Sequence, residues 1–96
     1  MMAAESVSAL LPILDELIAL LRESDQKHWA AWLEKDRRLI ADGDFYGVEH
    51  LLRAFGGMGS FNDVVLGEAE RDARLDALRG ALYDCAASVR RARERS

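Results

Sequence analysis

The chain has 96 residues, of which 50% are hydrophobic and 31% are charged, and its formal net charge is −4. This composition predicts one globular domain over residues 1–96 and excludes a disordered chain, because enough apolar side chains are present to form a core. The net negative charge disfavours a general nucleic-acid binder, because acidic groups repel phosphates.

The charge is distributed unevenly along the chain. Residues 1–70 hold 6 Lys and Arg against 13 Asp and Glu, whereas residues 71–96 hold 7 Arg against 4 Asp and Glu. The chain therefore has an acidic body and a basic end. The simplest interpretation of the basic end is a set of cations beside the negative end of a helix dipole.

Cysteine content and the first residues indicate the compartment. Cys85 is the single cysteine, so an intramolecular disulfide and a thiolate zinc site are excluded, and a cytoplasmic protein is expected. The first six residues carry no basic group, and the apolar stretch over residues 9–21 is interrupted by Asp15 and Glu16. We therefore expect neither a signal peptide nor a membrane-spanning helix.

Apolar side chains recur at helical spacing over residues 8–22, which predicts the first helix. The shared face consists of Leu10, Leu11, Leu14, Leu17, Ile18 and Leu21. Proline lacks the backbone N–H that a helix interior needs, so we expect the helix to start near residues 8–11 or to kink at Pro12.

Two further helices are predicted over residues 25–41 and 44–55. Asp25 and Asp44 are the expected N-caps, because an aspartate carboxylate accepts hydrogen bonds from first-turn N–H groups. Gly43 suits the left-handed conformation that often ends a helix. The expected buried side chains are Trp29, Trp32, Leu33 and Ile40 in the first of these helices and Phe45, Val48, Leu51, Leu52 and Phe55 in the second.

A glycine-rich loop follows at residues 56–60, and a short helical turn is predicted over residues 61–66. Ser60 and Asp63 have the spacing of a capping box, with Asp in place of the more usual Glu. The last helix is predicted over residues 68–93, with Leu75, Leu78, Leu82, Cys85, Ala86 and Val89 on its buried face. The expected fold is all-α, a compact bundle of four main helices with the Gly-rich loop before the last helix.

Three segments carry a resemblance to a known family. They are Trp29-Ala30-Ala31-Trp32-Leu33, Asp42-Gly43-Asp44, and the block Gly56-Gly57-Met58-Gly59-Ser60-Phe61-Asn62-Asp63-Val64-Val65-Leu66. Together they resemble a family of small bacterial proteins of unknown function, over roughly residues 28–66. The resemblance implies a bacterial origin and directs attention to residues 56–63, but it transfers no activity.

The glycine-rich block has three interpretations. The first is a tight structural corner with Phe61 packed inside, which the composition favours most. The second is a contact surface for another protein, with Met58 and Phe61 as apolar anchors. The third is an anion site built from backbone N–H groups, which Asp63 opposes by repulsion. The residues concerned are Gly57, Met58, Gly59, Ser60, Phe61, Asn62 and Asp63.

The remaining motifs do not support catalytic residues, a metal site or a cofactor. The segment from Asp42 resembles the start of a calcium loop, but Arg53 stands where a bidentate glutamate is required. His28 and His50 lack a second metal ligand at helical spacing, and Cys85 lies on an apolar face. We expect structural roles for all three, and we do not expect an enzyme.

The favoured functional hypothesis is a small acidic protein-interaction module that contacts a partner through the Gly-rich loop. A toxin-neutralising, immunity-like protein is one concrete form, because acidity steers association with basic toxins. The alternative is a small-ligand or anion site at the same loop, with an enzyme less favoured. A homodimer through apolar faces of the first and last helices is a further arrangement to consider, whereas membrane and nucleic-acid partners are not expected.

Overall fold

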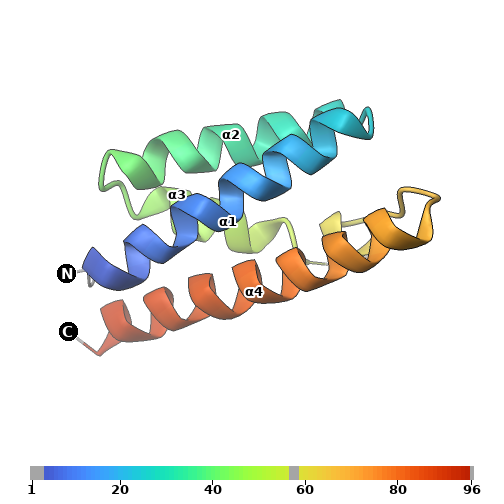
Figure 1. The fold of residues 1–96 in the computed structure, drawn as a ribbon. Helices are drawn as coiled ribbons and strands as arrows, with labels where there is room; N and C mark the ends of the chain where they lie inside the picture. Colours follow the sequence, from blue (N-terminus) through green and yellow to red (C-terminus); the bar gives the residue numbers. More distant parts are fainter. Residues whose placement is uncertain (1–3, 57–58, 96) are drawn as a thin grey trace.

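The structure is a computed structural model that describes residues 4–56 and 59–95. These residues form four α-helices and one short 3-10 turn, with no strand among them, as the all-α prediction requires (Figure 1). The helices are α1 (Ala4–Glu23), α2 (Lys27–Ala41), α3 (Tyr46–Arg53) and α4 (Ala69–Glu94), and the 3-10 turn is η1 (Phe61–Asp63).

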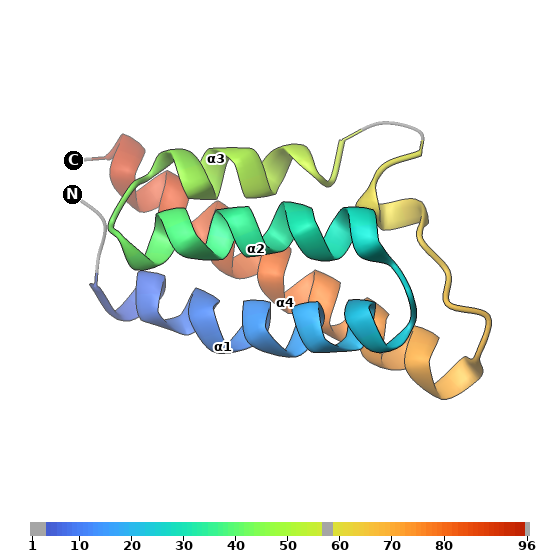
Figure 2. The same cartoon turned by 90° about the horizontal axis from the view of Figure 1, so that it is seen from above.

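The helices are arranged in two layers. Helices α1, α2 and α3 lie side by side with alternating direction, and α4 crosses beneath them at an angle (Figure 2). Helix α4 contacts both α1 and α3, so it closes the lower side of the layer. The two ends of the chain lie at the same end of the molecule, and the segment that joins α3 to α4 lies at the other (Figure 1, Figure 2).

The core lies between the two layers and is almost entirely aliphatic. Most side chains predicted to be buried are buried, and Leu20 and Ala30 join them. The fully buried large side chains are Phe61, Leu10, Leu14, Leu17, Leu21, Leu33, Ile40, Leu51, Leu75, Leu82, Val48 and Val89. Burial of this apolar surface is what holds helices together that would be marginal in isolation.

The start of α1 differs from the prediction. The helix begins at Ala4, so Pro12 lies inside it rather than in its first turn. A proline removes one intrahelical hydrogen bond. The helix continues on both sides of it because the buried leucines on either side, such as Leu10 and Leu14, pack into one core.

The turn between α1 and α2 also differs from the prediction. Asp25 does not cap α2, because the N-cap residue is Gln26 and it makes no side-chain capping bond. Asp25 instead has a φ of 59°, and the Gln26 N–H donates to the Leu21 carbonyl at 2.8 Å. This is the left-handed ending of a helix, so Asp25 terminates α1 rather than starting α2.

Candidate functional site

The segment over residues 59–67, here called the corner, leads from α3 to α4 around the 3-10 turn η1. Phe61 is fully buried at its centre, with its ring 5.4 Å from Trp29 and 5.6 Å from Phe55, centroid to centroid. The Phe61 N–H also donates to the Ala54 carbonyl at 2.8 Å. Phe61 therefore belongs to the hydrophobic core and joins the corner to α2 and to the end of α3.

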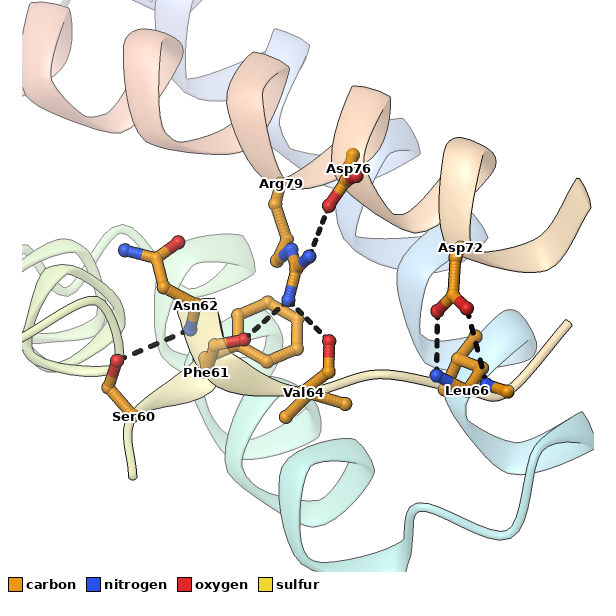
Figure 3. Close-up of polar contacts among 9 residues, drawn as sticks. Ser60, Phe61, Asn62, Val64, Leu66, Asp72, Asp76 and Arg79 are labelled. Carbon is orange, nitrogen blue, oxygen red and sulfur yellow. Dashed lines mark hydrogen bonds and ion pairs between the residues drawn. The ribbon is translucent and has the colours of Figure 1, made fainter. Parts of the chain in front are cut away.

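Two residues of α4 hold the backbone of the corner. Arg79 donates from Nη1 to the carbonyls of Phe61 and Val64, at 2.7 and 3.0 Å, and its Nη2 pairs with Asp76 (Figure 3). Asp72 accepts from the Leu66 N–H at 2.6 Å and from the Gly67 N–H at 3.2 Å. These bonds supply partners for the Val64 carbonyl and for the Leu66 and Gly67 N–H groups, add a second donor to the Phe61 carbonyl, and fix the corner against α4.

The predicted capping residues are both used, in a shifted arrangement. Ser60 is buried, and its hydroxyl accepts from the Asn62 N–H at 3.3 Å (Figure 3). The Asp63 carboxylate accepts from the Gly59 N–H at 2.7 Å, one residue before the cap position. The Gly59 amide is thus already occupied by an anionic group, which leaves less of the backbone for an external anion.

The remaining predicted contact residues either lie on the surface or fall outside the residues that the structure describes. Asn62 and Asp63 are exposed, and the Asn62 amide donates to the Phe55 carbonyl at 3.4 Å. Gly57 and Met58 lie outside the described residues, so a contact through Met58 stays a prediction. The structure brings Ser60, Phe61, Asn62 and Asp63 together in one turn. Ser60 and Phe61 are buried, whereas Asn62 and Asp63 are exposed.

A surface groove adjoins the corner on the side of α4. Its volume is about 450 Å³, and it is lined by Phe55, Asn62, Asp76, Arg79, Gly80, Tyr83 and Asp84. Tyr83 is 43% exposed and forms an edge-to-face pair with Phe55 at a centroid distance of 5.3 Å. The groove therefore combines an aromatic wall with ionisable side chains, a combination that the sequence analysis did not anticipate.

A second polar cluster lies between α2 and α3. Asp36 is fully buried, its Oδ1 is hydrogen-bonded to Nδ1 of His50, and its Oδ2 has no hydrogen-bond partner. Burial raises the pKa of Asp36 from 3.8 to about 6, and the hydrogen bond from His50 only partly opposes this rise. Because an ionised carboxylate only accepts hydrogen bonds, Nδ1 of His50 carries the proton whenever Asp36 is ionised.

Aromatic side chains hold the His50 ring in place. The Trp32 ring stacks on it at a centroid distance of 4.2 Å and an interplanar angle of 19°, and the Trp32 indole N–H donates to the His50 carbonyl at 3.3 Å. Tyr46 lies 5.8 Å from the same ring. An Asp–His pair can orient an imidazole for proton transfer, but no serine, threonine or cysteine is among the partners described for His50. The arrangement instead connects α2 to α3.

Gly47 allows these two helices to approach closely. A Cβ atom at this position would lie 2.8 Å from Leu39 Cβ, 2.9 Å from Ile40 Cγ1 and 3.0 Å from the Asp36 carbonyl oxygen. These distances are too short for any side chain, so the α2–α3 contact requires glycine. The sequence pattern predicts a structural role for His50 but does not reveal its partner Asp36. The available signal was Asp36 itself, which falls on the apolar stripe of α2 with Leu33 and Ile40.

The other motifs have structural roles in the part of the chain that the structure describes. The N-cap position of α3 is Phe45 rather than the predicted Asp44, but the Asp44 carboxylate accepts from the N–H of Tyr46, the first residue of the helix, at 3.0 Å. Gly43 has a φ of 80° in the turn before it. Burial raises the pKa of Cys85, which is partly buried against the core. Within residues 4–56 and 59–95, no group of three or more His, Cys, Asp or Glu side chains could hold a metal ion. None of the helices there has the length and apolar character needed to cross a membrane.

Comparison with known proteins places the chain in a family. Residues 22–73, just over half of the chain, match a domain of unknown function, DUF6966. The chain belongs to the DUF6966 family. The part that matches DUF6966 contains α2, α3, the Asp36–His50 pair and the whole corner, whereas most of α1 and α4 lies outside it. No curated protein and no solved structure matches the chain.

Proposed function

We propose that the chain is a small acidic protein-interaction module of the cytoplasm, which binds a basic partner protein through the outward face of the corner. Neutralisation of a basic toxin, as immunity proteins do, is one concrete form of this function. The proposal is supported by the net charge of −4, which would steer association with a basic partner.

The observation that carries the proposal is the exposed apolar side chain in the corner. Val65 is 72% exposed, although its neighbours Val64 and Leu66 are partly buried and their backbone groups are bound by Arg79 and Asp72. A surface that is already ordered loses little conformational entropy on binding, so an apolar group held in this way is suited to contact a partner. The alternative, a small-ligand or anion site at the loop, has less support because Asp63 already accepts from the Gly59 amide.

The test is affinity capture from a lysate of the source organism, at low and high salt. We expect the wild-type chain to retain a basic protein that high salt releases, and Val65→Ser to lose it. Ala31→Ser is the matched control, because Ala31 is an exposed apolar residue on α2, remote in sequence from the corner. Circular dichroism establishes that all three proteins have the same helix content.

Two outcomes contradict the proposal. If wild type, Val65→Ser and Ala31→Ser all retain the same protein equally, the contact does not involve the corner. If no basic protein is retained by the wild-type chain at either salt concentration, the chain is not an interaction module of this kind.

A further inference from the structure

Gly80 occupies a position in α4 for which packing does not require glycine. A Cβ atom at Gly80 would meet nothing within 4 Å, in contrast to Gly47. Gly80 also lies in the middle of α4, where glycine costs about 1 kcal/mol relative to alanine. The space that a side chain would fill is the groove beside the corner. The consequence of glycine here is therefore an open groove rather than a closer contact within the chain.

Two carboxylates flank this opening. Asp76 and Asp84 each lie four residues from Gly80, so they stand about one helical turn away on either side of it and on the same face of α4. The Asp76 side chain is 70% exposed, and Asp84 is exposed as well. A side chain that entered the groove at Gly80 would have one carboxylate on each side.

The cation of the groove is already bound within the chain. The Arg79 side chain is only 11% exposed, and its guanidinium is held by Asp76 and by the carbonyls of Phe61 and Val64 (Figure 3). Asp84 has no ion pair with any residue in the described part of the chain. Because Asp76 and Arg79 offset each other, the uncompensated negative charge of the groove is that of Asp84, beside the aromatic rings of Tyr83 and Phe55.

We propose that the groove centred on Gly80 binds a single arginine or lysine side chain of a partner protein. The cation would pair with Asp84, and its stem or guanidinium plane would pack on Tyr83, which adds a cation–π attraction. Asp76 already pairs with Arg79 and lies about 12 Å from Asp84 along α4, so it adds only a weaker, longer-range attraction. This inference rests on the proposed function and adds the chemistry by which the basic partner is recognised. The groove lies next to Asn62, so it continues the contact surface of the corner.

A second copy of the chain is a poorer occupant of the same groove. If two α4 helices packed antiparallel across a two-fold axis at Gly80, Asp76 of each copy would face Asp84 of the other. Like charges placed opposite one another oppose this arrangement. Nucleic acids and anionic membranes are disfavoured for the same reason, because their phosphates would approach the two carboxylates.

The first test uses amide-detected NMR of the full chain titrated with acetyl-arginine-amide. We expect shifts at Gly80, Tyr83 and Asp84, which decrease as salt is added. Acetyl-citrulline-amide, which has the same shape without the charge, should leave these amides unshifted. Equal shifts with both probes, or no shift at these three residues, would overturn the proposal. Stronger binding of spermidine than of the arginine and lysine amides would identify a free polyamine as the occupant, which also contradicts it.

Variants test whether the probe binds in the groove rather than elsewhere on α4. Gly80→Gln places its Cβ in open space and its side chain at the groove, and it is expected to weaken binding of the arginine probe at least about tenfold, a loss of about 1.4 kcal/mol. Ala81→Gln is the matched control, because Ala81 is the adjacent exposed position and does not line the groove. Asp84→Asn should weaken binding of the arginine probe by roughly twofold to fivefold. Equal binding by wild type, Gly80→Gln and Ala81→Gln would overturn the assignment.

Capture of the partner distinguishes failure of this inference from failure of the proposed function. If wild type and Gly80→Gln retain the same basic protein, the interaction module stands and the groove is not its recognition site. If the arginine probe binds but no basic protein is captured, the groove is a cation site and the proposed function fails. Loss of the partner in Gly80→Gln, with retention by Ala81→Gln, supports both the groove as the recognition site and the proposed function.

Discussion

The carboxylate of Asp36 is buried between two helices with only one of its oxygen atoms hydrogen-bonded. The native protein binds a proton at this residue with a pKa of about 6, whereas the unfolded chain does so near 3.8. Between these pH values the native state holds a proton that the unfolded state has released. Lowering the pH from 7 to 4 therefore raises the contribution of Asp36 to the free energy of unfolding.

Asp36→Asn removes this dependence. We expect the stability of the variant relative to wild type to fall by about 1–3 kcal/mol between pH 7 and pH 4, with most of the change between pH 6 and pH 4. Urea unfolding at several pH values measures the difference. Asp84→Asn is the control, because Asp84 is exposed, and its stability relative to wild type should change little. Parallel profiles for wild type and Asp36→Asn would contradict the prediction.

Two glycines in helices predict opposite effects of alanine. Gly47→Ala places a Cβ within 2.9 Å of two α2 side-chain atoms and is expected to cost about 1–3 kcal/mol, despite the better helix propensity of alanine. Gly80→Ala places its Cβ in open space and is expected to raise stability by about 0.5–1 kcal/mol. Thermal and urea unfolding of both variants measure the signs. A stable Gly47→Ala variant would show that α2 and α3 do not approach as closely as the structure indicates.

At the scale of elements, the corner depends on α4 for its shape. The three-residue η1 is too short to satisfy its own backbone, and Arg79 and Asp72 supply the missing partners from another helix. The same arrangement explains why a segment with no long helix and with glycine at both ends keeps a defined conformation over residues 59–67.

Arg79→Met keeps much of the aliphatic stem and removes the guanidinium. We expect a loss of about 1–3 kcal/mol and faster amide hydrogen exchange over residues 61–66, because the Val64 carbonyl loses the Arg79 donor and the Phe61 carbonyl keeps only the Val64 N–H. Arg74→Met is the matched control, since Arg74 is an exposed arginine on the same helix and should change neither quantity much. Unchanged exchange in Arg79→Met would mean that the corner is held by its own packing.

Helix boundaries were predictable where the signal is local. The extents of α2, α3 and α4 agree with the predicted ranges to within about two residues at each end, and Asp44 accepts from the first N–H of α3 one residue before the N-cap position. The start of α1 and the role of Asp25 were predicted wrongly. In both cases tertiary packing determined the outcome. The core stabilises a helix that contains Pro12, and the angle between α1 and α2 requires a left-handed residue at Asp25.

At the scale of the whole molecule, Phe61 joins the corner to the core. Phe61→Ala should cost about 3–5 kcal/mol. In a domain of this size the melting temperature would then fall by at least about 12 °C. Val65→Ala is the control, because Val65 is 72% exposed, and it should change stability by less than about 0.5 kcal/mol. Melting followed by circular dichroism measures both, and similar melting temperatures would place Phe61 outside the core.

The sequence by itself determined the all-α class, the order and approximate extent of the helices, and the acidic character of the chain. These properties depend on apolar spacing and composition, which are local and can be counted along the chain. The tertiary structure decided which distant residues meet: Asp36 with His50, Arg79 with the corner, Gly47 with α2, and Asp84 with the aromatic wall around Gly80. These contacts depend on how the helices cross and which faces they share, and side-chain periodicity within one helix does not specify the position of another.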